Sequence, residues 1–260
     1  MTLRDGVSLI YITSPIPSHP GTELLDASIN SMKSTTYPFY ERVIVYDFPT
    51  SSNINYNKYK KKVKKKYPTY THLELKKHGH FIGTLKKALL YCKTKYFLLV
   101  QHDITLIGAF PVKQILDAVF NWNIIFTHHK PKGLTKPTHW FPIIQKPRRL
   151  KVKGKIIGPP SFLLKTFGWS ERIFLSKTKF MLDKINEIQQ KKLSSKFVES
   201  VFNKQFTKMF KKLENIKTYK DIPKKSKHQI EYNNYWDTWK CYAIKSKVCY
   251  HKHLFGRTAK

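Results

Sequence analysis

Three apolar runs in the first 105 residues each end abruptly in polar residues. The runs and the residues that follow them are 7–12 with Thr13 and Ser14, 42–46 with Asp47, and 96–100 with Gln101, His102 and Asp103. Continuous apolar runs of this length are typical of strands that are buried on both faces of a mostly parallel sheet. Because ligands gather at the carboxyl ends of such strands, the polar residues are candidates for a functional site.

Segments with helical spacing separate these runs. Thr22 can cap a helix with apolar residues at Leu24, Leu25, Ile29 and Met32. Gly83 begins a second helical segment, with Leu85, Ala88, Leu89 and Cys92 on one face. The order strand, helix, strand, helix, strand predicts a βαβαβ half-sheet of the nucleotide-binding kind, with a lysine-rich segment after Asp47 that the pattern does not assign.

The second half of the chain has three recognisable segments. Residues 127–155 are rich in Pro and Lys and are expected to form loops. Residues 194–213 carry a broad apolar stripe and are expected to form a helix. The C-terminal segment 248–257 alternates apolar residues with His251 and His253, whose side chains would point to the same side of an extended strand.

The length of 260 residues and a hydrophobic content of 41% are enough for a substantial core, and we expect a single domain. No run of about 18 apolar residues and no secretory signal occurs, so we expect a soluble, cytoplasmic protein. The three cysteines, Cys92, Cys241 and Cys249, lack metal-site spacing and are expected to be buried thiols.

The formal net charge is +33, which suggests a polyanionic partner. The lysines are spread along the whole chain, however, and only six residues are arginine, the residue best suited to bidentate phosphate contacts. Abundant Lys, Asn and Ile are typical of an AT-rich genome. We therefore expect no nucleic-acid partner, while peripheral contact with an acidic membrane surface stays open.

Few of the sixteen acidic residues are candidates for chemistry. Asp47 and Asp103 end strands, Glu171 follows a Gly-Trp-Ser segment, and Asp237 lies in a Trp-rich segment. Glu199 lies at the edge of the apolar stripe near the start of the expected 194–213 helix. There it could complement the helix dipole, or it could be a rigid, partly desolvated general base.

The order of these segments resembles that of GT-A-fold glycosyltransferases of the family-2-like, inverting type. The residues that carry the resemblance are Thr13, Asp47, the Gly83 helix, the strand into Gln101-His102-Asp103, 158–161, 197–199 and 253–257. The resemblance covers nearly the whole chain. It implies that residues 1–105 form the nucleotide-sugar-binding half of the domain and that residues 106–260 form the acceptor-binding half with a C-terminal metal-binding tail. It implies an α/β, GT-A-like fold with a mostly parallel central sheet, a Rossmann-like nucleotide-binding half and helices on both faces.

The resemblance also implies an activity in glycan biosynthesis. A hexosyl- or pentosyltransferase would move a sugar from a nucleotide-diphosphate sugar donor to a hydroxyl of a glycan or glycoconjugate acceptor. The implied donor-binding residues are Thr13, Ser14, Asp47, Gln101, His102 and Asp103, and the implied acceptor-binding residues are Trp169, Ser170 and Glu171.

The same resemblance implies a divalent cation, Mn²⁺ or Mg²⁺, as cofactor. Asp103 is similar to the last acid of the Asp-x-Asp metal motif, His253 to the C-terminal metal ligand with His251 as the alternate, and Glu199 to the catalytic base. Gln101 stands where the motif usually has its first acid, so strict metal dependence does not follow. A polyanion- or nucleic-acid-binding protein and a metal-dependent nucleotidyltransferase remain as alternative functions.

Overall fold

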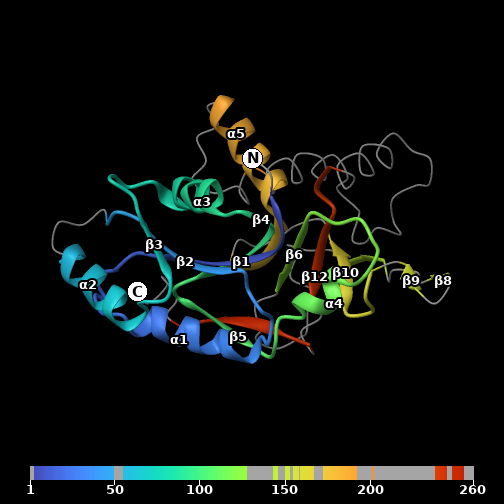
Figure 1. Cartoon of the computed structure of the whole chain (residues 1–260), viewed down its shortest axis with the longest axis horizontal. Helices are drawn as coiled ribbons and strands as arrows, with labels where there is room; N and C mark the ends of the chain where they lie inside the picture. The colour runs from blue at the N-terminus through green and yellow to red at the C-terminus, as the bar shows by residue number, and fades with distance from the viewer. Residues whose placement is uncertain are drawn as a thin grey trace, which may run out of the picture.

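The computed structural model describes residues 3–49, 55–127, 143–145, 150–152, 155–157, 159–166, 172–191, 201, 238–244 and 248–254. Its centre is a nine-stranded sheet in the order β3-β2-β1-β4-β11-β6-β12-β10-β7 (Figure 1). The strands are β1 Arg4–Thr13, β2 Glu41–Tyr46, β3 Thr71–Glu74, β4 Thr94–Gln101, β6 Ile124–Thr127, β7 Ile143–Gln145, β10 Leu163–Thr166, β11 Ile173–Lys177 and β12 Cys241–Ile244.

The sheet is mostly parallel, as expected from the apolar runs. β3, β2, β1 and β4 are parallel neighbours, and so are β6 and β12. β11 is antiparallel to both β4 and β6, and β10 is antiparallel to both β12 and β7. Seven of the nine strands therefore run in one direction, and β10 and β11 run in the other.

Helices cover both faces of the sheet (Figure 1). α1 Glu23–Ser31 and α2 Tyr56–Lys66 pack on one face, and α3 His80–Tyr91 and α5 Thr178–Gln190 pack on the other. The strands supply both faces because successive side chains alternate: Ile10 packs against the α3 side and Tyr11 against the α1 side. The expected α/β architecture is confirmed.

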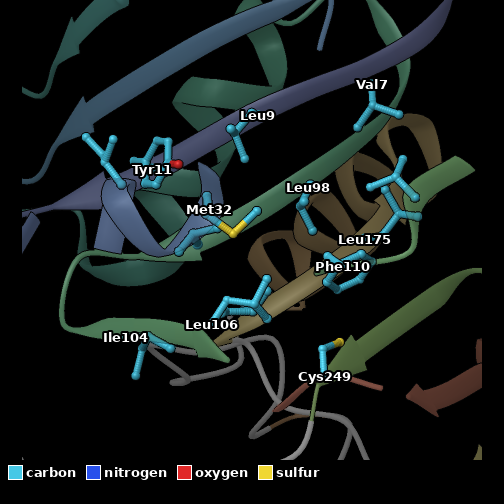
Figure 2. Close-up of a cluster of buried hydrophobic side chains, with 14 of the residues drawn as sticks. Val7, Leu9, Tyr11, Met32, Leu98, Ile104, Leu106, Phe110, Leu175 and Cys249 are labelled. Atoms are coloured by element: carbon cyan, nitrogen blue, oxygen red, sulfur yellow. The ribbon is translucent and has the colours of Figure 1, made fainter. Parts of the chain in front are cut away.

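A second layer lies on the α1 side. β5 Ile104–Ile107 pairs antiparallel with β13 Tyr250–His253, so this part of the C-terminal segment is extended, the form considered for His251 and His253 from their alternation. Figure 2 shows Ile104, Leu106 and Cys249 in one cluster with Leu9 and Leu98 of the central sheet. Burial of these side chains holds β13 against the elements formed by the first half of the chain.

The remaining described elements are short. They are the 3-10 turn η1 Met32–Ser34, the helix α4 Val112–Leu116, and the antiparallel pair β8 Leu150–Val152 and β9 Lys155–Ile157. None of the helices in the described ranges is long and apolar enough to cross a membrane. All three cysteines are buried free thiols, as expected.

Two helices agree closely with the sequence pattern. Thr22 directly precedes α1, although its hydroxyl donates to the Asp26 carboxylate (2.9 Å) and makes no capping bond. α3 begins at His80, three residues before the expected start at Gly83. The first turn of α3 therefore adds the buried apolar residues Phe81 and Ile82, which the expected start at Gly83 leaves out.

The structure assigns one segment that the sequence left open and corrects one expectation. The unassigned lysine-rich segment contains α2 and leads into β3, because Tyr56, Tyr59 and Val63 place one helical face in the core. The segment 127–155, expected to form loops, includes β7 and β8. Such three-residue strands depend on partners distant in the sequence rather than on their own composition. Of the helix expected at 194–213, the structure describes only Val201, which is buried on the α3 side.

Candidate functional site

The polar residues that end the three apolar runs meet at one edge of the sheet. The backbone N–H of Asp47 donates to the Thr13 carbonyl (2.9 Å), which joins the ends of β2 and β1. The N–H of His102 donates to the Ile12 carbonyl (3.0 Å), which joins the ends of β4 and β1. The sheet thus gathers these residues as the sequence predicts, with Gln101 as the last residue of β4.

Asp47 is buried, and both of its carboxylate oxygens contact the segment that leads into α3. Oδ1 accepts the N–H of Gly79 (2.8 Å), and Oδ2 lies 3.1 Å from Nδ1 of His78. The same Nδ1 is 2.6 Å from the Phe48 carbonyl oxygen, which can only accept, so Nδ1 carries a proton. Asp47 therefore fixes the turn before α3.

His78 and His80 extend this network, and the sequence analysis did not single out either residue. Nε2 of His78 lies 2.8 Å from Nδ1 of His80. His80 has a φ of 53°, in the left-handed region that is uncommon for non-glycine residues. The sequence signal for these residues is a His-Gly-His triplet just before a helical pattern.

Thr13 is completely buried, and its hydroxyl lies 2.5 Å from the phenol oxygen of Tyr59 in α2. Burial raises the pKa of Tyr59, so the phenol stays neutral and can share a proton with the hydroxyl. The contact joins β1 to α2. Ser14, the next residue, is half-buried at the same edge.

The C-terminal strand reaches the turn between β4 and β5. His102 and Asp103 form this turn, and the N–H of Leu254 donates to the Asp103 carbonyl (3.0 Å). In the register of β13 and β5, His253 pairs with Ile104. The backbone of His253 therefore lies beside Asp103, although 149 positions separate the two residues in the sequence.

His251 is buried with both ring nitrogens near protein atoms. Nδ1 lies 2.8 Å from the hydroxyl oxygen of Thr127 at the end of β6, and Nε2 lies 3.4 Å from a guanidinium nitrogen of Arg172. A guanidinium can only donate, so Nε2 accepts and Nδ1–H donates to Thr127, which makes the imidazole neutral.

Asp103 is the described carboxylate that suits a divalent cation at this edge. Within the described part of the chain, no group of three or more His, Cys, Asp or Glu side chains is arranged to hold a metal ion. The side chain of His253 and the expected site residues Trp169, Ser170, Glu171 and Glu199 lie outside the described residues. Of the predicted metal ligands, the structure thus describes Asp103 and His251 with their side chains and His253 by its backbone, and metal binding stays a prediction.

No protein-family model and no curated protein sequence matches this chain. Solved structures do match its fold. S. aureus TarS has a TM-score of 0.51 at 13% identity, over 96% of this chain and 37% of that one. TarS 1–349 in complex with UDP has a TM-score of 0.49 at 14% identity, over 95% and 60%. GalNAc-T7 with UDP, GalNAc and Mn²⁺ has a TM-score of 0.47 at 10% identity, over 97% and 44%.

The match to TarS spans almost all of this chain, so the likeness concerns the whole architecture rather than one βαβ unit. The chain has a GT-A-like α/β fold, as expected from the sequence. It corresponds to little more than a third of the length of TarS.

Proposed function

We propose that this chain is a glycosyltransferase that moves a sugar from a nucleotide-diphosphate donor to an acceptor hydroxyl with inversion. The observation that carries the proposal is the meeting of Thr13, Asp47 and Asp103 at one sheet edge, where the tail strand also ends. Nucleotides bind at this edge in open α/β sheets.

The donor would bind across the ends of β1, β2 and β4. We assign the nucleoside to Thr13, Ser14 and Asp47, where Thr13 and Asp47 act mainly by holding α2 and the turn before α3 in place. We assign the diphosphate side to Gln101, His102 and Asp103.

Asp103 and His253, with His251 as the alternate, would hold Mn²⁺ or Mg²⁺. When bound, the cation would neutralise negative charge on the departing nucleoside diphosphate. Because Nε2 of His251 faces Arg172 in this structure, His253 is the better candidate for the second ligand.

The acceptor side of the proposal is based on the sequence resemblance. Trp169, Ser170 and Glu171 would line it, and the acceptor would be a glycan or glycoconjugate. An acceptor hydroxyl is a poor nucleophile at neutral pH, so its proton must pass to a base as the new bond forms. We assign that base to Glu199.

A screen of nucleotide sugars tests the proposal by measuring release of nucleoside diphosphate with and without glycan acceptors. With the active donor, Glu199→Gln should keep nucleotide and metal affinity while transfer falls by about 10²–10⁴-fold, the usual contribution of a general base. Asp237→Asn, in a Trp-rich segment, is the control and should transfer at nearly the wild-type rate.

Three outcomes would contradict parts of this proposal. Turnover of nucleoside triphosphate without a sugar would favour a nucleotidyltransferase. Tighter binding to oligonucleotide than to nucleoside diphosphate with Mn²⁺ would favour a polyanion-binding protein. Normal transfer by Glu199→Gln together with loss in Asp237→Asn would move the base to Asp237.

A further inference from the structure

One cationic side chain lies at the proposed donor edge without a role in the reaction described above. Arg172 directly precedes β11, and because β11 runs against β4, its first residues lie at the carboxyl end of β4. The Arg172 carbonyl accepts the N–H of Gln101 (3.1 Å). Arg172 is therefore fixed beside the strand end that leads into Asp103.

The guanidinium keeps most of its hydrogen-bonding capacity. It is half-buried, and its contact with Nε2 of His251 (3.4 Å) uses one of its five N–H donors. No carboxylate in the described ranges lies within ion-pair distance of Arg172. Its charge is thus not neutralised by any of the described residues.

His251 holds this guanidinium without cancelling its charge. The imidazole is buried and is anchored through Nδ1 to the Thr127 hydroxyl (2.8 Å). The neutral ring presents Nε2 to Arg172 as an acceptor. A carboxylate in the same place would hold the side chain equally well but would pair with it and weaken its attraction for an anion.

The charge balance at the end of β4 suits an anionic ligand. Among the described residues at this strand end, Gln101 is neutral, Asp103 carries a negative charge and Arg172 carries a positive charge. Two carboxylates would repel a diphosphate until a cation bound between them, whereas a guanidinium can donate two parallel hydrogen bonds to phosphate oxygens directly.

We propose that Arg172, positioned by His251, binds the diphosphate of the donor and gives the chain a metal-independent part of its affinity for nucleoside diphosphates. The inference rests on the proposed glycosyltransferase function for the identity of the ligand. Gln101 provides no negative charge to hold a cation against the diphosphate. Arg172, from the second half of the chain, would neutralise part of the diphosphate charge instead.

Isothermal titration of the full chain with inorganic pyrophosphate, UDP and GDP tests the inference, in EDTA and with Mn²⁺ at physiological salt. Wild type should bind at least one nucleoside diphosphate in EDTA, and pyrophosphate more weakly. Arg172→Gln should weaken binding in EDTA by about tenfold or more, the effect of losing a charge-assisted hydrogen-bond pair. Arg172→Lys keeps the charge without the planar fork and should give an intermediate loss.

Arg42→Gln is the matched control because Arg42 is exposed near the start of β2, at the opposite edge of the sheet. It removes the same charge and should leave the affinity unchanged, which separates a specific site from the general attraction of a basic protein. Circular dichroism melting of each variant checks that it folds, and Arg172→Lys supplies the test if Arg172→Gln does not.

Any of three results would overturn the inference. The first is that wild type binds these ligands only with Mn²⁺, and the second is that wild type and Arg172→Gln have equal affinity in EDTA. Equal losses in Arg42→Gln and Arg172→Gln would also overturn it. If Arg172→Gln loses binding but no nucleotide sugar is turned over, the anion site stands and the glycosyltransferase proposal fails. If sugar transfer occurs and Arg172→Gln binds nucleoside diphosphate normally, the glycosyltransferase proposal stands and the anion site at Arg172 fails.

Discussion

At the scale of single residues, the sequence predicted where Thr13 and Asp47 lie but not what their side chains contact. Thr13 and Asp47 lie at the strand ends that the sequence predicts, yet their side chains contact Tyr59 and His78 of this chain. Both side chains therefore hold neighbouring parts of the chain in place at this edge of the sheet. Sequence reasoning located them because an apolar run marks its own end, but it could not identify their partners.

The buried hydroxyl pair of Thr13 and Tyr59 gives a test of this view. Thr13→Val keeps the shape of the side chain but leaves the Tyr59 phenol without its partner, so urea unfolding should show a loss of about 1–2 kcal/mol. Tyr59→Phe removes the same hydrogen bond and should cost a similar amount. If Thr13 acts through α2, both variants should lower nucleoside diphosphate affinity by similar factors.

A much larger loss of affinity in Thr13→Val than in Tyr59→Phe, at equal stability, would show instead that the Thr13 hydroxyl contacts the ligand directly.

At the scale of secondary structure elements, α2 shows how a polar segment forms an ordered helix. Asn55 caps it by accepting the N–H of Lys58 (2.9 Å), and Tyr56, Tyr59 and Val63 are buried at helical spacing. Lysines on the other faces stay at the surface. Only three of the eleven positions of α2 are buried, and most of the others are lysine. The apolar pattern of this helix is therefore hard to recognise in the sequence.

An ion-pair cluster joins α2 to the edge strand β3. Lys60 and Lys64 lie 2.5 and 2.7 Å from the carboxylate of Glu74, and their hydrogen bonds lower the pKa of that carboxyl below its usual 4.5. Since the pKa is lower in the folded state, the pairing stabilises the fold above about pH 4.5. This stabilisation is lost as the pH falls through the folded-state pKa.

We expect Glu74→Gln to lower the free energy of unfolding by about 0.5–1 kcal/mol at neutral pH, because the pairs are partly exposed. Urea unfolding at pH 7 and at pH 3 measures this, and the difference from wild type should shrink at pH 3. Asp5→Asn, which removes an exposed pair with Lys95, is the control and should change little. A Glu74→Gln effect that is equal at both pH values would contradict the electrostatic explanation.

At the scale of the whole molecule, the GT-A-like fold and the charge of +33 lead to different expectations about partners. The fold gathers polar strand ends at one edge, where we propose a nucleotide site, whereas the charge alone favours any polyanion. The sequence has 16 acidic residues against 49 basic residues, so most basic side chains have no carboxylate to pair with one to one and can attract anions non-specifically.

Binding to duplex DNA should therefore be weak, independent of sequence, and strongly reduced by salt. Fluorescence anisotropy with two unrelated duplexes at about 50 and 200 mM salt measures this, and affinity should fall steeply between the two conditions. Tight, sequence-selective binding at physiological salt would instead place a nucleic acid among the biological partners.

The sequence by itself determined the strands β1, β2 and β4, the helices α1 and α3, and the residues at the strand ends. These elements could be predicted because each buries a strand or one helical face, and buried positions appear in the sequence as apolar runs or as apolar residues at helical spacing. The extended form of the C-terminal segment followed from its alternating pattern in the same way.

Only the tertiary structure decided which distant segments meet. The reversal of β11 brings Arg172 to the end of β4, and the pairing of β13 with β5 brings the backbone of His253 beside Asp103. Local periodicity carries no information on strand direction or on long-range partners, because a buried strand has the same pattern in either direction. Strand direction and the pairing of distant segments depend on the path of the chain between elements and on which helices cover each face of the sheet.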